Sequence, residues 1–227
     1  MPKDHLRRLN TPKSWPIKRK NIKYIKRPNP GAHPIKLGIP LTVLLRDLMG
    51  IAKTFKEVRR MLHNKEVFVD ERRVKEPKFN VGLFDTITLL KDSYRVIVAQ
   101  NKRLAVTTIT KDEAKLKPCK IIGKTKVKGK AQINLYDARN ILVDKEEYKV
   151  GDTILIELPS QKIKDHIKLE KGALIFLIGG KHMGDMGHIE GIFNNRIIYK
   201  NKESEKIETL NKYAFVIGKE KPLVKIE

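Results

Sequence analysis

The chain is poor in cysteine and in long apolar runs, and each scarcity narrows the classes of protein to which it can belong. Its one cysteine, Cys119, cannot form an internal disulfide, which fits a reducing compartment and favours a small buried hydrophobe over a catalytic thiol. No run of about 18 apolar residues is available to span a membrane. The N-terminus lacks the apolar core of a signal peptide, and no lipidation signal is visible. The sequence therefore disfavours a secreted or membrane protein.

Acidic residues are also scarce relative to basic ones. The 227 residues include 49 lysines and arginines against 26 aspartates and glutamates, for a formal net charge of +23. This excess is larger than solubility needs and indicates a polyanionic partner. With 40% hydrophobic residues the chain can still build real cores, and its length fits one to three domains, here several small ones.

A catalytic or metal-binding constellation is missing from the sequence. Residues 179–181 (Gly-Gly-Lys) do not have the spacing of a phosphate-binding loop, and His182 stands where that loop needs Ser or Thr. His182, Asp185 and His188 are three residues apart, but no fourth metal ligand is apparent and the glycines between them oppose a helix. No arrangement of nucleophile and base is visible. We therefore predict no enzyme activity, no metal site and no cofactor.

Residues 1–41 differ in composition from the rest of the chain. They contain eleven basic residues against one acid, Asp4, and seven prolines that break any helix. This composition predicts a basic arm that is ordered only on a partner. Trp15 and Tyr24 stand among the cations, where they either stack on splayed bases or pin the arm to its own globular body, and the sequence favours neither.

Residues 42–93 predict two helices followed by short strands. Four leucines recur at helical spacing, with Thr42 as a candidate N-cap and Gly50 as the end of the first helix. Thr54 and Glu57 form a capping box for the second helix, which has one apolar and one basic face. The basic face carries Lys56, Arg59, Arg60 and His63. Taken alone, such a face is more often a solvated surface than an RNA contact, but the net charge of the chain reverses this preference.

The chain from residue 94 to residue 170 is expected to be β structure. Strands are predicted at 94–98 and 104–109, at most one short helix at 111–116, and a hairpin around Gly129. Lysines alternate along this hairpin, which would place all four on one face, either as a row that contacts phosphates or as a solvated edge. We slightly favour RNA contact for this row, which consists of Lys124, Lys126, Lys128 and Lys130.

Residues 171–227 predict a small SH3-like barrel, because short strands alternate with glycine turns about every ten residues. A glycine-rich loop at 179–187 joins two of these strands. A loop lined by backbone groups, with Lys181 and His182 within it, is suited to contact RNA phosphates.

Four stretches of the chain resemble parts of a known family. Residues 54–74 resemble the S-four-type RNA-binding module, in which they match the helix and the strand at Thr54, Arg59, Leu62, Val67, Val69 and Val74. Residues 179–189 resemble the KOW motif of ribosomal and transcription factors, with its glycine at Gly187. Together with the opening residues 3–15 and the ending residues 215–218, this order is similar to small-subunit ribosomal protein four of the archaeal and eukaryotic type.

Two positions depart from the pattern of the S-four-type module. Phe55 stands where the module usually has its first arginine, which removes one expected phosphate contact. Glu71 stands where the module often has glycine, which puts a negative charge near the expected RNA face.

The resemblance implies an α+β multidomain protein. Its parts would be a basic extended N-terminal arm (1–41), a small two-helix plus β RNA-binding module (42–93), a central β domain (94–170) and a C-terminal SH3-like (KOW) β-barrel (171–227). It implies a structural constituent of the small ribosomal subunit, cytoplasmic and not enzymatic, whose partners are small-subunit rRNA and neighbouring ribosomal proteins. No membrane and no autonomous homo-oligomer are expected, and the lack of a long tail beyond Glu227 favours an archaeal source.

An alternative hypothesis is a KOW-containing transcription elongation or antitermination factor, which would co-purify with RNA polymerase. A third is an RNA-modifying enzyme, for which no catalytic carboxylate or thiol is visible. The candidate RNA-binding residues of the first hypothesis are cations and one tryptophan: Lys3, Arg7, Arg8, Lys13, Trp15, Lys18, Arg19, Lys20, Lys23, Lys26, Arg27, Arg46, Lys53, Lys56, Arg59, Arg60, Lys65, Arg72, Arg73, Lys124, Lys126, Lys128, Lys181 and His182.

Overall fold

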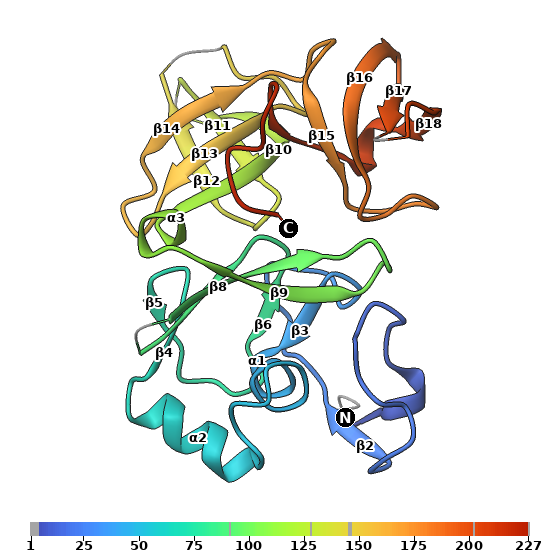
Figure 1. Cartoon of the computed structure of the whole chain (residues 1–227). Helices are drawn as coiled ribbons and strands as arrows, with labels where there is room; N and C mark the ends of the chain where they lie inside the picture. The colour runs from blue at the N-terminus through green and yellow to red at the C-terminus, as the bar shows by residue number, and fades with distance from the viewer. Residues whose placement is uncertain (1–4, 91, 128, 145–146, 202, 227) are drawn as a thin grey trace. The chain divides into compact units, whose positions relative to one another are not determined.

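The structure is a computed structural model that divides into two compact units, Met1–Lys115 and Leu116–Glu227. Both units consist mainly of antiparallel strands with a few short helices (Figure 1). The β-rich, multidomain character expected from the sequence is thereby confirmed, whereas the four-part division of the chain remains a finer prediction. The structure describes residues 5–90, 92–127, 129–144, 147–201 and 203–226.

The N-terminal segment of the first unit is folded onto that unit. Strand β1 (His5–Arg7) pairs with β2 (Tyr24–Lys26), and β3 (Gly38–Pro40) pairs with β6 (Asn80–Gly82). Trp15 is only 2% exposed, and its indole Nε1 donates hydrogen bonds to two backbone carbonyls, at 2.9 Å to Gly38 and 3.1 Å to Ile35. Of the two roles considered for Trp15, the structure therefore supports the pin and not the stacking platform.

A second clamp holds the same segment. The imidazole Nε2 of His33 lies 3.0 Å from Oδ1 of Asp85, with both residues buried, and the backbone N–H of Leu104 donates to the carbonyl of Ser14 at 2.8 Å. The structure thus differs from the expectation of an arm that is ordered only on a partner. A few well-placed anchors fix the segment even though its composition is too polar for a core of its own.

The first helical stretch spans the four leucines but is not a regular α-helix throughout. It comprises α1 (Leu41–Val43) followed by one wide π-type turn, η2 (Leu44–Leu48). Thr42 is not the N-cap, because the helix begins after Pro40; its buried hydroxyl instead donates to the carbonyl of Pro77 at 2.7 Å. Gly50 follows the turn in the left-handed conformation, with φ +68°, as predicted.

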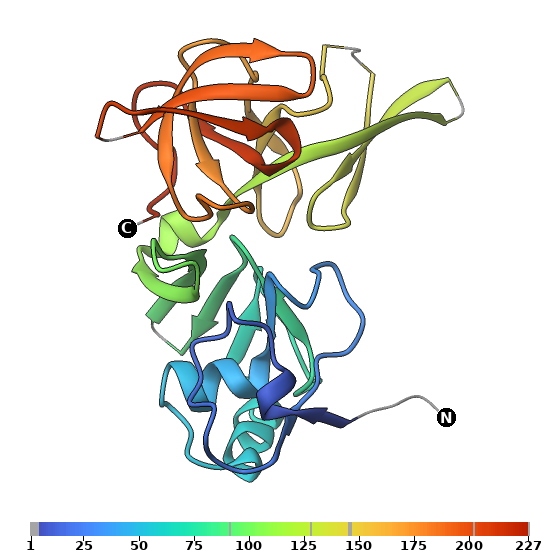
Figure 2. The same cartoon turned by 90° about the vertical axis from the view of Figure 1, so that its right-hand side faces the viewer.

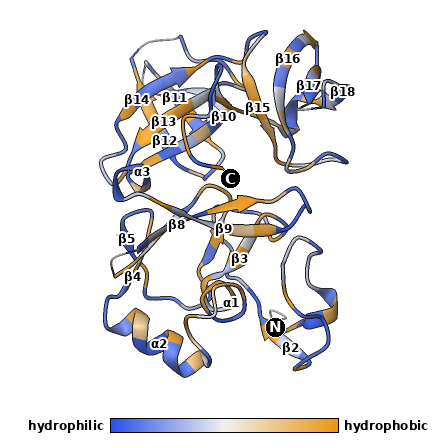
Figure 3. Cartoon of the chain, in the orientation of Figure 1, coloured by the Kyte–Doolittle hydropathy of each residue, from blue (hydrophilic) through white to orange (hydrophobic). Residues whose placement is uncertain are grey.

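The second helix, α2 (Phe55–His63), begins as predicted. The hydroxyl of Thr54 accepts from the backbone N–H of Glu57, and the carboxylate of Glu57 accepts from the backbone N–H of Thr54. Val58 and Leu62 are buried on one face, while most of the helix is hydrophilic (Figure 3). The capping box and this apolar face fix where the basic face begins and where it points.

One antiparallel sheet runs through the first unit, with strand order β5-β4-β7-β8-β9. Its strands are β4 (Val67–Val69), β5 (Arg72–Arg73), β7 (Thr86–Leu89), β8 (Asp92–Val98) and β9 (Leu104–Ile109), and a short helix, α3 (Lys111–Ala114), follows. Strand β8 pairs with β7 across the boundary that the sequence suggested between residues 93 and 94, with Ser93 opposite Thr88 and Tyr94 opposite Ile87. The strands predicted at 94–98 and 104–109 therefore complete the sheet of the preceding module.

The first sheet of the second unit has the order β12-β11-β10-β13-β14. Its strands are β10 (Leu116–Val127), β11 (Lys130–Leu135), β12 (Asn140–Val143), β13 (Thr153–Glu157) and β14 (Ile163–Ile167). Cys119 is buried in its core beside Ile121, Ile133 and Ile154, as expected of a small hydrophobe. The hairpin of β10 and β11 projects from the rest of this sheet (Figure 2).

The second sheet of this unit has the order β18-β17-β16-β15-β19. Its strands are β15 (Leu174–Leu177), β16 (Met186–Phe193), β17 (Arg196–Asn201), β18 (Lys206–Leu210) and β19 (Ala214–Gly218). A Cβ atom at Gly187 would collide with the carbonyl of Lys200, so the backbone approach of β16 to β17 requires glycine there. The description of this sheet as an SH3-like barrel remains a prediction.

A buried lysine joins the two sheets of the second unit. The Nζ atom of Lys120, on β10, donates to the carbonyls of Asn211 at 2.9 Å and Ala214 at 2.6 Å, next to and within β19. Burial lowers the pKa of this ammonium group to about 8, because a charged group loses its hydration inside the protein.

Candidate nucleic-acid interface

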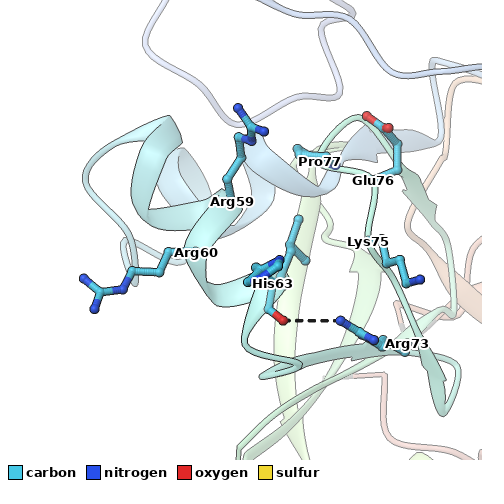
Figure 4. Close-up of a pocket in the computed structure, with 8 residues that line it drawn as sticks. Arg59, Arg60, His63, Arg73, Lys75, Glu76 and Pro77 are labelled. Carbon is cyan, nitrogen blue, oxygen red and sulfur yellow. Dashed lines mark hydrogen bonds between the residues drawn. The ribbon is translucent and has the colours of Figure 1, made fainter.

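A basic cleft lies between α2 and the segment that follows β4. It has a volume of about 620 Å³, and Figure 4 shows the side chains around it. The chain around the cleft contributes five basic side chains and one carboxylate. The residues that line it are Arg59, Arg60, Leu62, His63, Arg73, Lys75, Glu76 and Pro77.

Helix α2 positions the arginines of this cleft. Val58 and Leu62 face the core, so the helical period turns Arg59 and Arg60 to the exposed side. Figure 4 shows the two guanidinium groups leaving the helix in different directions. Their spread means that they can bind separate anionic groups rather than one.

Arg73 lies on the side of the cleft opposite α2 and contacts the C-terminal end of that helix. Its Nη2 atom donates to the backbone carbonyl of His63 at 3.3 Å, at the C-terminus of α2. A cation there satisfies an otherwise unpaired carbonyl and interacts favourably with the negative end of the helix dipole. Arg73 remains exposed, so its other donors face solvent.

The cations along the outer face of α2, and Lys53 just before it, are not held in ion pairs among the described residues. Lys53, Lys56, Arg59 and Arg60 are exposed, and within the described part of the chain none forms an ion pair. The carboxylate of Glu57 accepts from the backbone N–H of Lys53 at 2.7 Å, which lowers its pKa, and it also accepts from the backbone N–H of Thr54 in the capping box. The positive potential of the helix face is therefore available to an external anion.

The predicted residues of the N-terminal segment fall into two groups. Arg8 is 3% exposed and donates to the carbonyls of Ile22 and Lys18, so it holds the segment together. Tyr24, in contrast, is 44% exposed. The predicted cations of the segment that are exposed are Arg7, Lys13, Lys18, Arg19, Lys20, Lys23 and Arg27. Lys3 lies outside the described residues.

Lys26 is half-buried and takes a different position from the other cations of the segment. Its Nζ atom lies 4.2 Å from the centroid of the Phe55 ring, at the start of α2. This is a cation–π contact between β2 and the helix. Neither the contact nor the closeness of the two elements was visible in the sequence.

Three further predicted cations lie around the module. Arg46 is half-buried and pairs with Asp47 at 2.7 Å, whereas Lys65 and Arg72 are exposed. Glu71, the acid expected near the RNA face, accepts a hydrogen bond from the hydroxyl of Thr88 at 3.3 Å.

The predicted row of four lysines is not one row. Lys124 and Lys126 share a face of β10, but Lys130 lies on β11 opposite Val127, and this register turns it to the other face. Lys130 also pairs with Asp144 at 2.9 Å. The sequence analysis placed the turn around Gly129 but did not account for the change of face that the turn imposes on Lys130. Lys128 lies outside the described residues.

The glycine-rich loop has its own structural reasons for glycine. A Cβ atom at Gly179 would come within 2.6 Å of the Tyr213 ring. Lys181 is exposed, and Nδ1 of His182 lies 3.3 Å from Oδ2 of Asp185. Across the residues that the structure describes, no three His, Cys, Asp or Glu side chains gather as metal ligands would.

Sequence reasoning missed Lys75 as a lining residue of the cleft. It lies in the loop after β5, and its one signal was its position two residues after Arg73.

No helix in the described ranges is long and apolar enough to cross a membrane.

Comparisons with known proteins bear on both units. A family model described as "Ribosomal family S4e" matches residues 90–163, and another described as "RS4NT (NUC023) domain" matches residues 1–36. The small ribosomal subunit protein eS4 of Methanocaldococcus jannaschii is 38% identical over 241 residues, which cover 99% of this chain and 98% of that protein. The protein of the same name from Staphylothermus marinus is 39% identical over 241 residues, covering 99% and 96%.

A solved structure is similar as well. The crystal structure of the 30S ribosomal protein S4e from Thermoplasma acidophilum matches with a TM-score of 0.70 at 29% sequence identity. The match covers 80% of this chain and 95% of that chain.

Proposed function

This chain belongs to the ribosomal S4e family and is a protein of the small ribosomal subunit, where we propose that it binds and braces ribosomal RNA through the cations around the α2 cleft. It acts in the cytoplasm as part of that particle, and its role is structural and not catalytic. Its partners are small-subunit rRNA and neighbouring ribosomal proteins. Membership of this family removes the reason to retain a transcription factor as the alternative.

The observation that carries the proposed site is the set of unpaired cations on α2. Lys53, just before α2, and Lys56, Arg59 and Arg60 on it are exposed, and within the described residues none of them forms an ion pair. Arg73 and the cleft continue that face. RNA phosphates are the anions that suit such a surface, because binding them releases condensed counterions. Arginine adds directional donors that match phosphate oxygens in pairs.

The N-terminal segment, residues 1–41, adds positive charge to the proposed RNA-binding surface. Its exposed cations are carried on a segment that Trp15 and His33 hold against the first unit, so they meet the RNA without a large loss of chain entropy. Arg8 and Trp15 act indirectly, by holding the segment in place. Lys124, Lys126 and Lys181 are further proposed contacts on the second unit.

Sedimentation of cell extract on a density gradient tests the assignment to the particle. At low salt the chain is expected to migrate with the small subunit, and raised salt should release it because phosphate contacts are screened. A chain that sediments freely at low salt, or with RNA polymerase, contradicts the assignment.

A further inference from the structure

The ammonium group of Lys26 lies in a position where the surrounding positive charge is unfavourable for a cation. Its ammonium group lies over Phe55, the first residue of α2, and the N-terminus of a helix carries the positive end of the dipole. Lys53, just before the N-cap, and Lys56, in the first turn, add two more positive charges near this helix end. Within the described residues no carboxylate pairs with Lys26, and that of Glu57 is engaged in the capping box. The aromatic ring is the group that holds this cation.

Both partners of the contact are fixed by their own elements. Ile25 is 6% exposed and anchors β2 in the core, so strand alternation turns Lys26 to the opposite face of the strand. Phe55 is fixed because the capping box sets the first turn of α2. The meeting of ammonium and ring therefore follows from two well-ordered backbones.

The position of the ring links the contact to the cleft. Arg59 follows Phe55 by four residues, so their side chains are neighbours on the surface of α2. The Lys26 ammonium consequently lies at the start of the helix surface that continues through Arg59 into the cleft. A purely structural tether at this place would be better served by an apolar side chain, because a lysine is repelled by the charges around it.

We propose that Phe55 is a positioning residue that holds the Lys26 ammonium as a phosphate-binding cation next to Arg59, so that the N-terminal segment and the cleft present one continuous surface to the RNA backbone. The proposal rests on the proposed function, since it adds a cation to the RNA site described above. It also gives Phe55 a role in RNA binding although the side chain carries no charge.

The test measures binding of the full chain to purified small-subunit rRNA between about 50 and 200 mM salt. Lys26→Met keeps the apolar stem and removes the charge; it is expected to lower the affinity about three- to tenfold and the salt slope by about 0.7 to 0.9. Phe55→Leu should lower the affinity by a similar factor, and Lys26→Met added to it should lower it little further. Phe55→Tyr should recover most of the loss because it keeps the ring.

The decisive variant moves the charge from β2 to the helix. Lys26→Met combined with Phe55→Arg should restore the salt slope, since the cation returns to the start of α2 on another residue. A structural role for the contact predicts no such rescue. Lys206→Met is the matched control, because Lys206 pairs with Glu190 at 2.9 Å on the second unit.

The outcomes separate this proposal from the one on which it rests. If Lys26→Met binds like the wild type while Arg59→Ala with Arg60→Ala weakens binding, the positioning role is wrong and the cleft stands. If neither changes the affinity, the proposed RNA site itself is wrong. If Lys26→Met weakens binding but the charge-relocated variant does not restore the slope, the contact is structural and the proposal is overturned.

Discussion

The two units of the chain differ less in how many cations they carry than in what those cations meet. Residues 1–115 contain 27 lysines and arginines against 11 acids, a net charge of +16, and residues 116–227 contain 22 against 15, a net charge of +7. In the second unit, several exposed cations pair with carboxylates, as Lys164 does with Glu157 at 3.1 Å and Arg196 with Glu208 at 2.8 Å. The cations of α2 form no ion pair within the described residues.

The difference in ion pairing affects the electrostatic potential of the surface more than the stability of the fold. An exposed ion pair contributes little to the free energy of unfolding, typically below about 1 kcal/mol. It does neutralise the local field, however, and a surface built of such pairs offers little to a polyanion. The pKa of Glu157 and that of Glu190 are lowered mainly by hydrogen bonds from their lysine partners, as expected for acids held in such pairs. Strong attraction of RNA is therefore expected from the first unit.

Removing the anchor of the N-terminal segment should have the largest effect. Trp15→Ala is expected to lower the stability of the first unit by about 3 to 5 kcal/mol, because a buried aromatic ring and its two hydrogen bonds are lost. Thermal unfolding measures this loss, and limited proteolysis should then cut between residues 16 and 36. Unchanged proteolysis would mean that the other contacts hold the segment without Trp15.

The contrast in pairing predicts a contrast in binding. Arg59→Ala with Arg60→Ala should weaken rRNA binding about tenfold or more and lower the salt slope by about two, with a small change in melting temperature. The matched pair on the second unit, Arg196→Ala with Lys206→Ala, removes the same charge from paired sites and should change the binding far less. Equal losses for the two pairs would show that net charge alone decides binding.

The second unit also buries one cation, Lys120, whose ammonium group donates to backbone carbonyls, and its effect on stability depends on pH. Lys120 has a pKa of about 8 when folded and 10.5 when unfolded, so the unfolded chain holds the proton more tightly between these values. Stability contributed by Lys120 should therefore rise from pH 8 to pH 10.5, by up to about 3 kcal/mol, and fall as pH drops through 8. Denaturant unfolding of the wild type and Lys120→Met at both pH values measures this difference. A difference that does not change with pH would contradict the lowered pKa.

The smallest expected effect comes from two capping boxes of the same kind. Thr54→Ala and Thr110→Ala each remove an N-cap, of α2 and α3, and each should cost about 1 kcal/mol of stability. We expect Thr54→Ala to weaken rRNA binding a few-fold as well, because frayed turns misplace the cations of α2. Thr110→Ala should leave binding unchanged, and equal losses of affinity would tie binding to general stability instead.

Local signals in the sequence were sufficient for elements that depend on neighbouring residues. The capping box at Thr54 and the left-handed Gly50 follow from chemistry within a few positions, and the structure confirms both. The Thr42 cap was wrong because a distant carbonyl, that of Pro77, takes its hydroxyl. Contacts between distant segments carry no local signal, and for this reason the burial of Trp15 stayed undecided.

The candidate site was foreseen in part for the same reason. Arg59 and Arg60 could be placed on one helix face by the helical period, but Lys75 came to the cleft only through the path of a loop. The contact of Lys26 with Phe55 joins residues 29 positions apart, and no periodicity predicts it. The face on which Lys130 lies was predicted wrongly, because the length of a hairpin turn decides which face each residue of the second strand occupies.

The hydrogen bond from Leu104 to Ser14 also determines when one part of the fold can form during synthesis of the chain. Ser14 leaves the translating ribosome about 90 residues before its partner, so the clamp cannot close until β9 has been made. At the several to twenty residues per second typical of translation, this hydrogen bond forms about five to twenty seconds after Ser14 is made. During that interval the cations of the N-terminal segment are already outside the ribosome, and nascent rRNA can meet them before the fold is complete.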